Sequence, residues 1–496
     1  MYNLCTMKPL RLSAQEREFF TLVTRAAFAN PFGEERAQLD RTIAGTPADG
    51  QALPQALRAV EQRVARLTAA GQATLASFAA ADRELMGLVF LFTTFHAFLE
   101  RMDRLILDQT AAGDESVPVP CAREALATLT GYGYDDAAAA RYFALFYQMR
   151  RAFYFIREGL VGGSPCLRRL REQLWNNIFT HDIRWYDRHL WNRMEDFSTL
   201  LLGETGTGKG AAASAIGRSG FVPFDEQRQR FAESFTKAFI ALNLSQFPEA
   251  LIESELFGHR KGAFTGAIEA HEGVFARCSP HGAIFLDEIG DVSVPVQLKL
   301  LQVLQERQFT PVGSHEKRRF AGRVIAATNQ PLDDLRRRGA FRADFYYRLC
   351  SDTIVMPPLR QLVQEDPREL DALLAHTLGR MTGAAAPDLC AFVRAAMERS
   401  LPPDYAWPGN VRELEQCVRR VLLTGGYHGD AVAQSADLQT RLARGVAEQT
   451  YPAEELLADY CALMYQHVGT YEEVARRTKL DRRTVKKHIA HAAERG

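Results

Sequence analysis

The spacing of apolar residues along the chain changes near residue 160. Over residues 10–158, apolar side chains recur at intervals of three and four positions, which is the period of an amphipathic helix. One such run consists of Tyr142, Phe146, Met149, Phe153 and Ile156. A stripe of this kind can line a ligand pocket, but it more often forms the face of a helix that packs into a core. The pattern predicts an all-α N-terminal domain over residues 1–159.

From residue 198 onward, short apolar segments alternate with segments of helical length. The short segments are rich in Ile, Leu, Val and Phe, and they read STLLL, KAFIALNL, GAIFLD and RVIAATN. Apolar runs of this length, separated by helices, are typical of a parallel sheet that is covered on both faces. The alternation predicts an α/β fold in which residues at the ends of the strands carry the chemistry.

Composition and charge limit the other possibilities. A chain of 496 residues is too long for one hydrophobic core, so we expect three or four units. Because 60 Lys and Arg balance 60 Asp and Glu, any contact with nucleic acid has to be local. The eight cysteines form no CxxC pair, which argues against a zinc site or a disulfide framework. The N-terminus lacks the apolar region of a signal peptide, and the longest uncharged apolar run, residues 85–99, is shorter than the roughly 20 residues of a spanning helix. We expect a cytoplasmic chain without membrane contact.

The segment GETGTGKG follows the first strand-like run and precedes the helical AAASAIG. Its spacing is that of a phosphate-binding loop, whose backbone N–H groups cradle phosphate oxygens at the start of a helix. We expect this loop to bind ATP, with Lys209 reaching the β- and γ-phosphates. Its residues are Gly203, Glu204, Thr205, Gly206, Thr207, Gly208, Lys209 and Gly210. Position 210 departs from the usual pattern, because Ser or Thr normally stands there and contacts Mg²⁺.

Acidic and amide side chains stand at the ends of two further strand-like runs. In GAIFLDEIGD, the apolar run delivers Asp287 and Glu288 to the carboxyl end of a strand, where ligands of α/β proteins bind. We expect Asp287 to hold Mg²⁺ and Glu288 to polarise a water molecule for attack on the γ-phosphate. In RVIAATN, Asn329 ends a neighbouring strand and is expected to sense the γ-phosphate. Taken alone, a pair of acids at a strand end can be only a helix N-cap.

Two arginines, Arg342 and Arg348, occur in FRADFYYRL. Positive charge brought to a transferring phosphoryl group is worth about 10³–10⁵ in rate in other P-loop enzymes. Each arginine alone is more often a surface ion-pair residue. Their interpretation therefore depends on the motifs around them.

The segment GAFTGA is unusual for the surface of a protein. Its residues are Gly262, Ala263, Phe264, Thr265, Gly266 and Ala267. It has no charge and is too rich in glycine for a stable helix or strand, whereas exposed loops usually carry polar residues. Either a core strand hides this segment, or the segment is a loop that contacts another protein.

Six motifs occur here in the order seen in the AAA+ domain of sigma-54-dependent transcription activators, the bacterial enhancer-binding proteins. They are ESELFGHRKGAFTGA, GAIFLDEIGD, LLQVLQERQFTPVGS, RVIAATN, FRADFYYRL and WPGNVREL. The resemblance covers residues 160–425 and implies a P-loop NTPase with an α/β subdomain over 160–358, a helical lid over 359–425 and a linker over 426–452. It further implies a homo-oligomer, usually a hexameric ring, that hydrolyses ATP to remodel sigma-54 RNA polymerase. The N-terminal domain would then be regulatory or sensory.

The resemblance also implies roles for single residues outside the phosphate loop. Asn243 matches the position that bonds Glu288 and thereby couples the nucleotide state to the acidic pair. Arg342 and Arg348 resemble arginine fingers that act on the neighbouring subunit. Arg412, in WPGNVREL, resembles the sensor arginine of the lid.

In this family the GAFTGA loop docks onto the sigma-54 subunit of RNA polymerase when ATP is bound and hydrolysed. Carried over to this chain, Phe264 and Thr265 would make that contact, and Gly262 and Gly266 would let the loop rise and fold back. An exposed apolar tip is then a transient binding surface.

The chain departs from the family in two respects. The family usually has Glu at position 210, and Gly210 removes that side chain and lowers helix propensity in the first turn. The segments before the phosphate loop and before the second strand are longer than usual. Three tryptophans in or near the first of these segments are expected to pack within the AAA+ core, although they could instead seat the N-terminal domain. They are Trp175, Trp185 and Trp191.

The C-terminal residues 453–496 are expected to form a helix-turn-helix that binds double-stranded DNA. Thr470 and Glu473 predict a capping box for a first helix, and Asp481 predicts the cap of a second. Residues 470–496 carry eight Lys or Arg and four Asp or Glu, although a solvated basic helix pair would show the same charge. The expected contacts are Arg482, Arg483 and Thr484 to base edges, and Lys486 and Lys487 to phosphates.

These features predict an ATP-hydrolysing activator that binds upstream DNA and converts closed promoter complexes of sigma-54 RNA polymerase into open ones. Two alternatives remain. One is an AAA+ remodelling enzyme that acts on another client. The other is a DNA-binding regulator whose ATPase is weak or absent because of Gly210.

Overall fold

The computed structural model describes residues 9–45, 52–384, 386–429, 438–439, 442–443, 446 and 452–495. The chain forms two compact units, which divide between Leu373 and Leu374. Most of the predicted linker, residues 426–452, lies outside the described residues. The division does not fall near residue 160, where the pattern of apolar residues changes.

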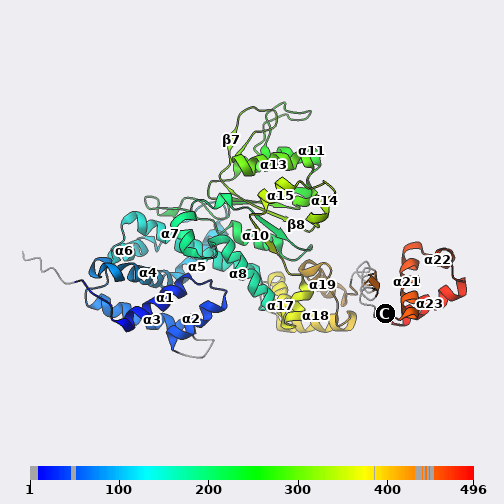
Figure 1. Cartoon of the computed structure of the whole chain (residues 1–496), viewed down its shortest axis with the longest axis horizontal. Coiled ribbons are helices and arrows are strands. Elements are labelled where there is room, and N and C mark those ends of the chain that lie inside the picture. Colours follow the sequence, from blue (N-terminus) through cyan, green and yellow to red (C-terminus); the bar gives the residue numbers. More distant parts are fainter. Residues whose placement is uncertain are drawn as a thin grey trace, which may run out of the picture. The chain divides into compact units, whose positions relative to one another are not determined.

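Helices α1 to α7 make up the N-terminal region (Figure 1). α1 begins at a capping box, in which Ser13 Oγ accepts from the N–H of Glu16 and the Glu16 carboxylate accepts from the N–H of Ser13. Asp135 is the N-cap of α7, and its carboxylate accepts from a backbone N–H of the first turn. The bounds are α1 Ala14–Phe28, α2 Glu34–Ala44, α3 Ala52–Ala69, α4 Ala80–Ala97, α5 Leu99–Ala112, α6 Ala122–Tyr132 and α7 Asp136–Gly159.

Five parallel strands form the central sheet in the order β4-β5-β8-β1-β9. Their bounds are β1 Thr199–Leu202, β4 Phe239–Asn243, β5 Ala283–Asp287, β8 Arg323–Thr328 and β9 Asp352–Val355. Leu200 and Leu201 are adjacent in β1 and both fully buried, so both faces of the sheet are covered. The predicted α/β fold is confirmed. Because all strands are parallel, their carboxyl ends meet at one edge.

Helices and short hairpins surround this sheet. α10 packs on β1, β5 and β8, and α8 packs on β9. The helices are α8 Pro165–Phe179, α9 Ile183–Trp185, α10 Lys209–Gly217, α11 Glu249–Phe257, α12 Val274–Arg277, α13 Val294–Glu306, α14 Leu332–Arg337, α15 Ala343–Leu349 and α16 Leu359–Glu365. The short strands are β2 Phe224–Asp225, β3 Arg230–Phe231, β6 Gln308–Phe309 and β7 Arg318–Arg319.

The N-terminal helices and the α/β region share a core through α7. Phe143 and Tyr147 of α7 stack on Phe231 of the β2–β3 hairpin, with ring centroids 6.0 and 4.2 Å apart. Phe224 and Phe235 belong to the same buried cluster. This region folds as one body because apolar side chains from both parts fill a single core.

The tryptophans of the long segment do not all pack as expected. Trp175 packs on Phe179 of its own helix, with ring centroids 4.5 Å apart, and also lies 6.3 Å from the ring of Phe32 in the N-terminal region, so it contacts both parts. Trp191 packs on Phe221 at 4.6 Å. Trp185 is 54% exposed.

The second unit is helical. α17 Arg368–Thr382 crosses the division, and the following helices are α18 Pro387–Ser400, α19 Asn410–Thr424, α21 Ala453–Val468, α22 Tyr471–Thr478 and α23 Arg482–Arg495. α21, α22 and α23 pack around Cys461, Val474 and Val485, each completely buried. This small core holds the C-terminal helices together as a group.

In the described part of the chain, no single helix is long and apolar enough to cross a membrane. The helices Ala80–Ala97 and Leu99–Ala112 meet the requirements of length and composition only when they are taken together, and they are bent by 54°.

Candidate nucleotide-binding site and partner-binding surfaces

The predicted phosphate loop connects β1 to α10 at the carboxyl edge of the sheet. Gly206 and Gly208 have φ of 81° and 91°, a left-handed conformation that suits glycine and turns the loop back on itself. Lys209 begins α10 and is buried, and its ammonium donates to the carbonyl oxygens of Gly203 and Glu204 at 2.9 and 3.1 Å. The N–H groups of the first turn of α10 have no partner within the helix, which is the arrangement that binds phosphate.

Close packing makes glycine necessary at the start of this loop. A Cβ added at Gly203 would lie 2.8 Å from the Cβ of Met356 and 3.0 Å from Thr207 Oγ1. At Gly210, by contrast, an added Cβ would meet no atom within 4 Å. The backbone at Gly210 therefore has room for the Cβ of another residue.

The acidic pair lies at the end of β5. Glu288 has φ of 56°, and its Oε2 is buried without a hydrogen-bond partner in the described structure. Burial, and then the neighbouring Asp287 carboxylate, raise the pKa of Glu288 above its ordinary value. At the end of β8, Asn329 donates from Nδ2 to Thr205 Oγ1 at 2.9 Å. The structure thus brings the acidic pair and Asn329 to the phosphate loop.

Asn243 lies beside Asp287 in the register of β4 and β5, but its side chain bonds locally. Its Oδ1 accepts from the N–H and Oγ of Ser245 at 3.0 and 2.7 Å. No hydrogen bond joins Asn243 to Glu288 in the described residues, contrary to the expectation. An Asn side chain readily bonds the backbone two residues on, and that short-range turn holds the amide here.

The two predicted arginine fingers differ in their surroundings. The guanidinium of Arg342 is partly exposed and pairs with the Asp344 carboxylate at 2.8 and 3.0 Å. The guanidinium of Arg348 donates two bonds, of 3.0 and 2.9 Å, to the carbonyl oxygen of Leu304 near the end of α13. Both arginines are thus bonded within their own chain, Arg342 to an exposed carboxylate and Arg348 to a backbone carbonyl.

Sequence reasoning missed Arg360 at the start of α16. Its guanidinium forms two bonds to the Glu204 carboxylate of the phosphate loop, of 2.8 and 2.5 Å. The two residues are 156 positions apart, so no local pattern links them. The order of the parallel strands could have suggested the contact between Arg360 and Glu204. β9 adjoins β1 in the sheet, β1 leads into the phosphate loop, and α16 follows β9.

The GAFTGA segment forms a loop between α11 and α12, at the end of the molecule drawn above α11 and α13 in Figure 1. Gly262 and Gly266 have φ of 79° and 101°, and the N–H of Gly262 donates to the carbonyl oxygen of Ala267 at 2.8 Å. Phe264 is 38% exposed, and its ring lies 4.9 Å from that of His259. Thr265 is exposed as well. Of the two possibilities left by the sequence, the segment is an exposed loop.

The WPGNVREL motif begins α19 in the second unit. Trp407 and Asn410 have φ of 50° and 53°. The buried Glu413 carboxylate accepts from the N–H of Gly409 at 2.8 Å and from the hydroxyl of Tyr427 at 2.9 Å, which fixes this turn. Arg412 is exposed on α19.

The two expected helix caps near the C-terminus have different outcomes. Asp481 Oδ1 accepts from the N–H of Arg483 at 2.8 Å, so the cap of α23 is confirmed. Thr470 precedes α22 but makes no side-chain cap bond, so the predicted capping box is wrong. The Glu473 carboxylate instead pairs with Arg476 and Arg477, at 2.6 and 2.8 Å, and this stronger charged contact replaces the cap.

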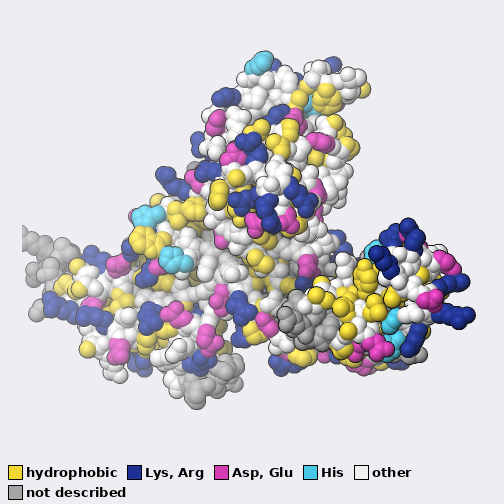
Figure 2. Space-filling view, turned by 45° about the vertical axis from the view of Figure 1, so that its right-hand side comes forward, with side chains coloured by type: hydrophobic (Ala, Val, Ile, Leu, Met, Phe, Trp, Pro, Cys, Tyr) yellow, Lys and Arg dark blue, Asp and Glu magenta, His cyan; other side chains and the backbone are white. Residues whose placement is uncertain are grey.

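Basic side chains gather over α22 and α23, where Figure 2 shows dark-blue Lys and Arg side chains at the right-hand end. Arg482 pairs with Glu472 at 3.0 Å, and both side chains are largely exposed. In the described residues, Arg483, Lys486 and Lys487 form no ion pair. Thr484 is half-buried beside them. The N-terminal part of α23 therefore presents uncompensated positive charge.

Comparison with known proteins matches this arrangement. Residues 188–355 match the model of the sigma-54 interaction domain, and residues 367–455 match that of the AAA+ ATPase lid domain. The chain is 39% identical over 275 residues to the Nif-specific regulatory protein of Azotobacter vinelandii, a match covering 54% of this chain and 45% of that protein. The chain thus spans less than half the length of that relative.

Two further proteins complete the comparison. The chain is 37% identical over 286 residues to the sigma54-dependent transcriptional activator SfnR of Pseudomonas putida, a match covering 56% of this chain and 71% of SfnR. The crystal structure of NtrX from Brucella abortus in complex with ATP covers 75% of this chain and 80% of its own, with 19% identity and a TM-score of 0.41, a likeness too weak to add to the assignment. With both domain matches and a relative covered over most of its length, the chain belongs to the family of sigma-54-dependent transcription activators.

Proposed function

We propose that the chain is an ATP-hydrolysing activator that binds upstream DNA and remodels closed complexes of sigma-54 RNA polymerase into open ones through its GAFTGA loop. The observation that carries this proposal is the buried, unpartnered Oε2 of Glu288 at the same sheet edge as the phosphate loop. A buried polar atom without a partner costs free energy unless a ligand or water supplies the missing bond. This supports a site shaped to receive a nucleotide and a water molecule.

Each residue of the site then has a task that its position supports. The N–H groups of the phosphate loop and the ammonium of Lys209 bind the phosphates, for which Lys209 exchanges its carbonyl partners. The Glu288 carboxylate orients the attacking water through its free oxygen. Asn329, which is bonded to Thr205 of the phosphate loop, would sense the γ-phosphate. Arg360 fixes the loop through Glu204.

Asp287 is the residue that would hold Mg²⁺. Mg²⁺ retains several waters and needs only one or two carboxylates beside the nucleotide phosphates. In the described structure, no three His, Cys, Asp or Glu side chains cluster to form a metal site from protein ligands alone. One carboxylate at the strand end is consistent with a metal that enters with the nucleotide and balances its charge.

Arg342 completes the site of a neighbouring subunit in a homo-oligomer, which we expect to be a hexameric ring. Its partner, Asp344, is exposed, so the pair is held weakly and Arg342 can exchange it for phosphate. For Arg348, the two bonds to Leu304 favour positioning α15 over direct contact with nucleotide. Arg412 on α19 is the proposed sensor of the lid.

The exposed GAFTGA loop is the proposed contact to sigma-54, with Phe264 and Thr265 at its tip. DNA binding is proposed for α23, with Arg482, Arg483 and Thr484 toward base edges. The uncompensated charge of Lys486 and Lys487 suits phosphates. A cytoplasmic location follows from these partners.

One alternative has a specific observation in its favour. Gly210 places no side chain at the start of α10, so a regulator with weak or absent ATPase activity is the second candidate. A Cβ added at this position would meet no atom within 4 Å, so a side chain can begin there without a clash. Replacing Gly210 with Glu therefore tests this alternative directly.

The experiment combines turnover with complex formation. ATP turnover of the full chain is measured, together with binding to isolated sigma-54 in ADP and aluminium fluoride, a mimic of the transferring phosphoryl group. We expect turnover and a stable complex. Thr265→Ala should abolish the complex and leave turnover intact, while Leu298→Ala, an exposed apolar control 45% accessible on α13, should change neither.

The outcomes separate the candidates. Turnover without a complex would refute sigma-54 as the client. Neither turnover nor complex, with both restored by Gly210→Glu, would favour the DNA-binding regulator. Loss of turnover in Thr265→Ala would assign the loop a structural role and contradict the proposed docking.

A further inference from the structure

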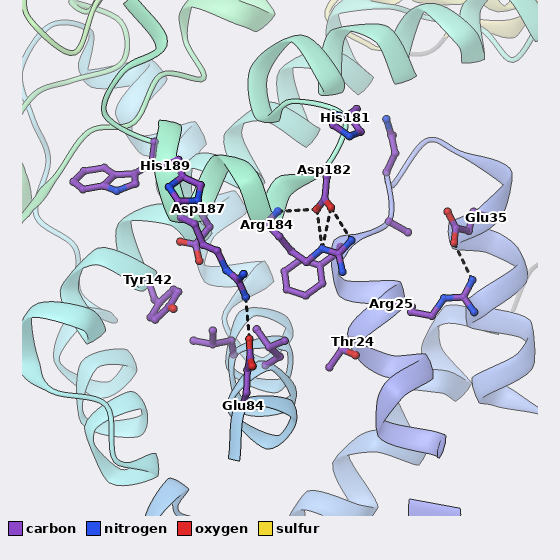
Figure 3. A pocket seen from close by; sticks show the side chains of 18 of the residues that line it. Thr24, Arg25, Glu35, Glu84, Tyr142, His181, Asp182, Arg184, Asp187 and His189 are labelled. Atoms are coloured by element: carbon purple, nitrogen blue, oxygen red, sulfur yellow. Dashed lines mark hydrogen bonds and ion pairs between the residues drawn. The ribbon is translucent and has the colours of Figure 1, made fainter. Parts of the chain in front are cut away.

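Two adjoining hollows lie among the N-terminal helices. The larger is an open cleft of about 1580 Å³ between α1, α2, α4, α7 and the segment around residues 181–189, crossed by ion pairs such as that of Glu84 with Arg188 at 2.9 Å (Figure 3). The smaller is a cavity of about 260 Å³. Phe28, Leu91 and Tyr142 line both, so the two hollows share part of their walls.

The wall of the smaller cavity is mostly aromatic and aliphatic. Six of its aromatic residues are Phe28, Phe92, Phe95, Phe146, Phe153 and Trp175. The apolar stripe of α7 thus forms part of a cavity wall as well as part of a core. Cavities of about 150 Å³ lined by apolar side chains hold benzene, so this space admits a larger ring system.

Every charged side chain on this wall already has a partner of opposite charge. The pairs are Arg36 with Asp40, Arg150 with Asp103, and Arg141 with Asp187. The cavity therefore offers no uncompensated charge to a ligand. A charged ligand would lose its hydration without a counter-charge, so the cavity selects a neutral one.

His96 is an uncharged polar residue of the cavity wall. Its Nδ1 lies 2.8 Å from the carbonyl oxygen of Phe92. A carbonyl only accepts, so Nδ1 carries the proton and Nε2 keeps a lone pair. Burial lowers the pKa of His96 to about 3, so the ring is neutral at physiological pH. In the described structure Nε2 has no hydrogen-bond partner, and it can accept one from a ligand.

We propose that this cavity binds a small neutral aromatic molecule that carries one hydrogen-bond donor, and that α7 transmits its presence to the phosphate-loop helix α10. The binding part stands on the cavity alone. The regulatory part rests on the proposed ATPase function.

The opposite face of α7 supports the second part. Arg151 donates to the carbonyl oxygens of Arg218 and Gly220 at 2.7 and 2.8 Å, and Gln148 donates to that of Ser219 at 2.8 Å. These carbonyls follow the last turn of α10, where a buried cation is favoured. α7 therefore touches the cavity with one face and holds the end of α10 with the other.

Tyr186 connects the cavity wall formed by the segment around residues 181–189 to the contact between α7 and α10. Its hydroxyl donates to Gln148 Oε1 at 2.9 Å, and its neighbour Asp187 lines the cavity. A ligand that presses on either wall would shift Gln148 against α10. Through this contact, the cavity and the phosphate-loop helix α10 share Gln148 of α7, and a ligand at either site can shift its position.

Calorimetry on the full chain tests the binding with three probes: 1-naphthol, naphthalene and 1-naphthoate. We expect 1-naphthol to bind at one per chain and naphthalene about fivefold more weakly, because it lacks the hydrogen-bond donor. We expect no binding of the 1-naphthoate anion. His96→Phe should remove the preference for 1-naphthol over naphthalene, and His96→Gln, which keeps an acceptor, should retain it.

Met149→Phe narrows the cavity and should weaken 1-naphthol binding at least tenfold. Met381→Phe, the same exchange at a side chain 37% exposed on α17, should not. Circular dichroism checks that both variants fold. The cavity assignment would be overturned if none of the three probes bound, or if 1-naphthol and naphthalene bound equally well. Undiminished binding of 1-naphthol to a folded Met149→Phe chain would overturn it too.

Hydrogen exchange tests the transmission without relying on ATP turnover. With 1-naphthol bound, amides of residues 213–220 should exchange at least threefold more slowly. In Gln148→Leu they should not respond, although 1-naphthol still binds. Unchanged exchange in the native chain would overturn transmission through α7. Turnover measured in parallel tells the two proposals apart, because a chain without turnover that still binds 1-naphthol fails only the proposed function.

Discussion

Replacing Arg151 with Met would test whether α7 stabilises the end of α10. The Arg151 side chain is 1% exposed, and its guanidinium donates to two carbonyls beyond α10, at 2.7 and 2.8 Å. Burial lowers the pKa of Arg151 to about 10, so the side chain is still charged at pH 7. A hydrogen bond to a charged group contributes about 1.5–3 kcal/mol to the free energy of unfolding. Removing the guanidinium also removes the cost of burying its charge, which offsets part of the stabilisation lost with the two bonds. We expect a net loss of about 3 kcal/mol from these two bonds.

Hydrogen exchange of the full chain measures this loss locally. A loss of about 3 kcal/mol corresponds to about 10²-fold faster exchange, since about 1.4 kcal/mol is tenfold. The increase should be confined to α7 and to residues 213–220, which lose a contact they share. Arg157→Met, an exposed change on the same helix, should alter exchange by no more than about twofold. Unaltered exchange at the end of α10 in a folded Arg151→Met chain would refute the reasoning.

Three other substitutions and one change of pH give distinct readouts. Gly210→Ala should raise the free energy of unfolding in urea by about 0.5–1 kcal/mol, because glycine costs this much in a helix and the added Cβ meets open space. Gly203→Ala, which places a Cβ 2.8 Å from Met356, should instead weaken ATP binding, and equal effects at both glycines would contradict the packing. Because burial raises the pKa of Glu288 and the carboxylate is the active form, ATP turnover should fall with decreasing pH, beginning at a higher pH than for an exposed Glu; a pH–rate profile without that decline would argue against this role. Lys487→Ala should weaken binding to all DNA sequences alike and reduce the slope of log K against log salt by about 1, which anisotropy titrations at several salt concentrations would show, while a sequence-dependent loss would place Lys487 at a base.

The phosphate loop and the acidic pair could be predicted because each is a continuous motif at the end of a strand. The parallel strand order then brings Asn329 to Thr205 across the sheet edge. Arg360 could not be found in this way, since its partner is 156 residues distant. A contact between distant segments depends on packing, which no local pattern encodes.

Local competition explains the other differences. At Asn243 the side-chain oxygen accepts from the backbone N–H of Ser245, so the amide closes its own turn. The Glu473 carboxylate forms ion pairs with two arginines one helical turn away, in place of the predicted bond to the backbone of Thr470. In both cases the residue types were compatible with two arrangements, and the side chain bonds to a local partner.

The apolar stripe of α7 shows a further limit. Its period correctly indicates a helix, and Phe146 is indeed buried. Periodicity reports which side of a helix avoids water, and a wall of a cavity avoids water as a core does. The difference lies in whether the opposing helices fill the space, and that is a property of the assembled bundle.

The aromatic cluster shared by α7 and the β2–β3 hairpin bears on how the chain can be cut or exchanged. A break after residue 159 would look natural in the sequence, yet it would strip the cover from Phe224, Phe231 and Phe235. A fragment starting at residue 160 would then expose an apolar surface and tend to aggregate. Domain-swap chimeras joined there would inherit the same exposed rings. The N-terminal helices are therefore part of the same folded unit as the α/β region, and they are not an interchangeable module.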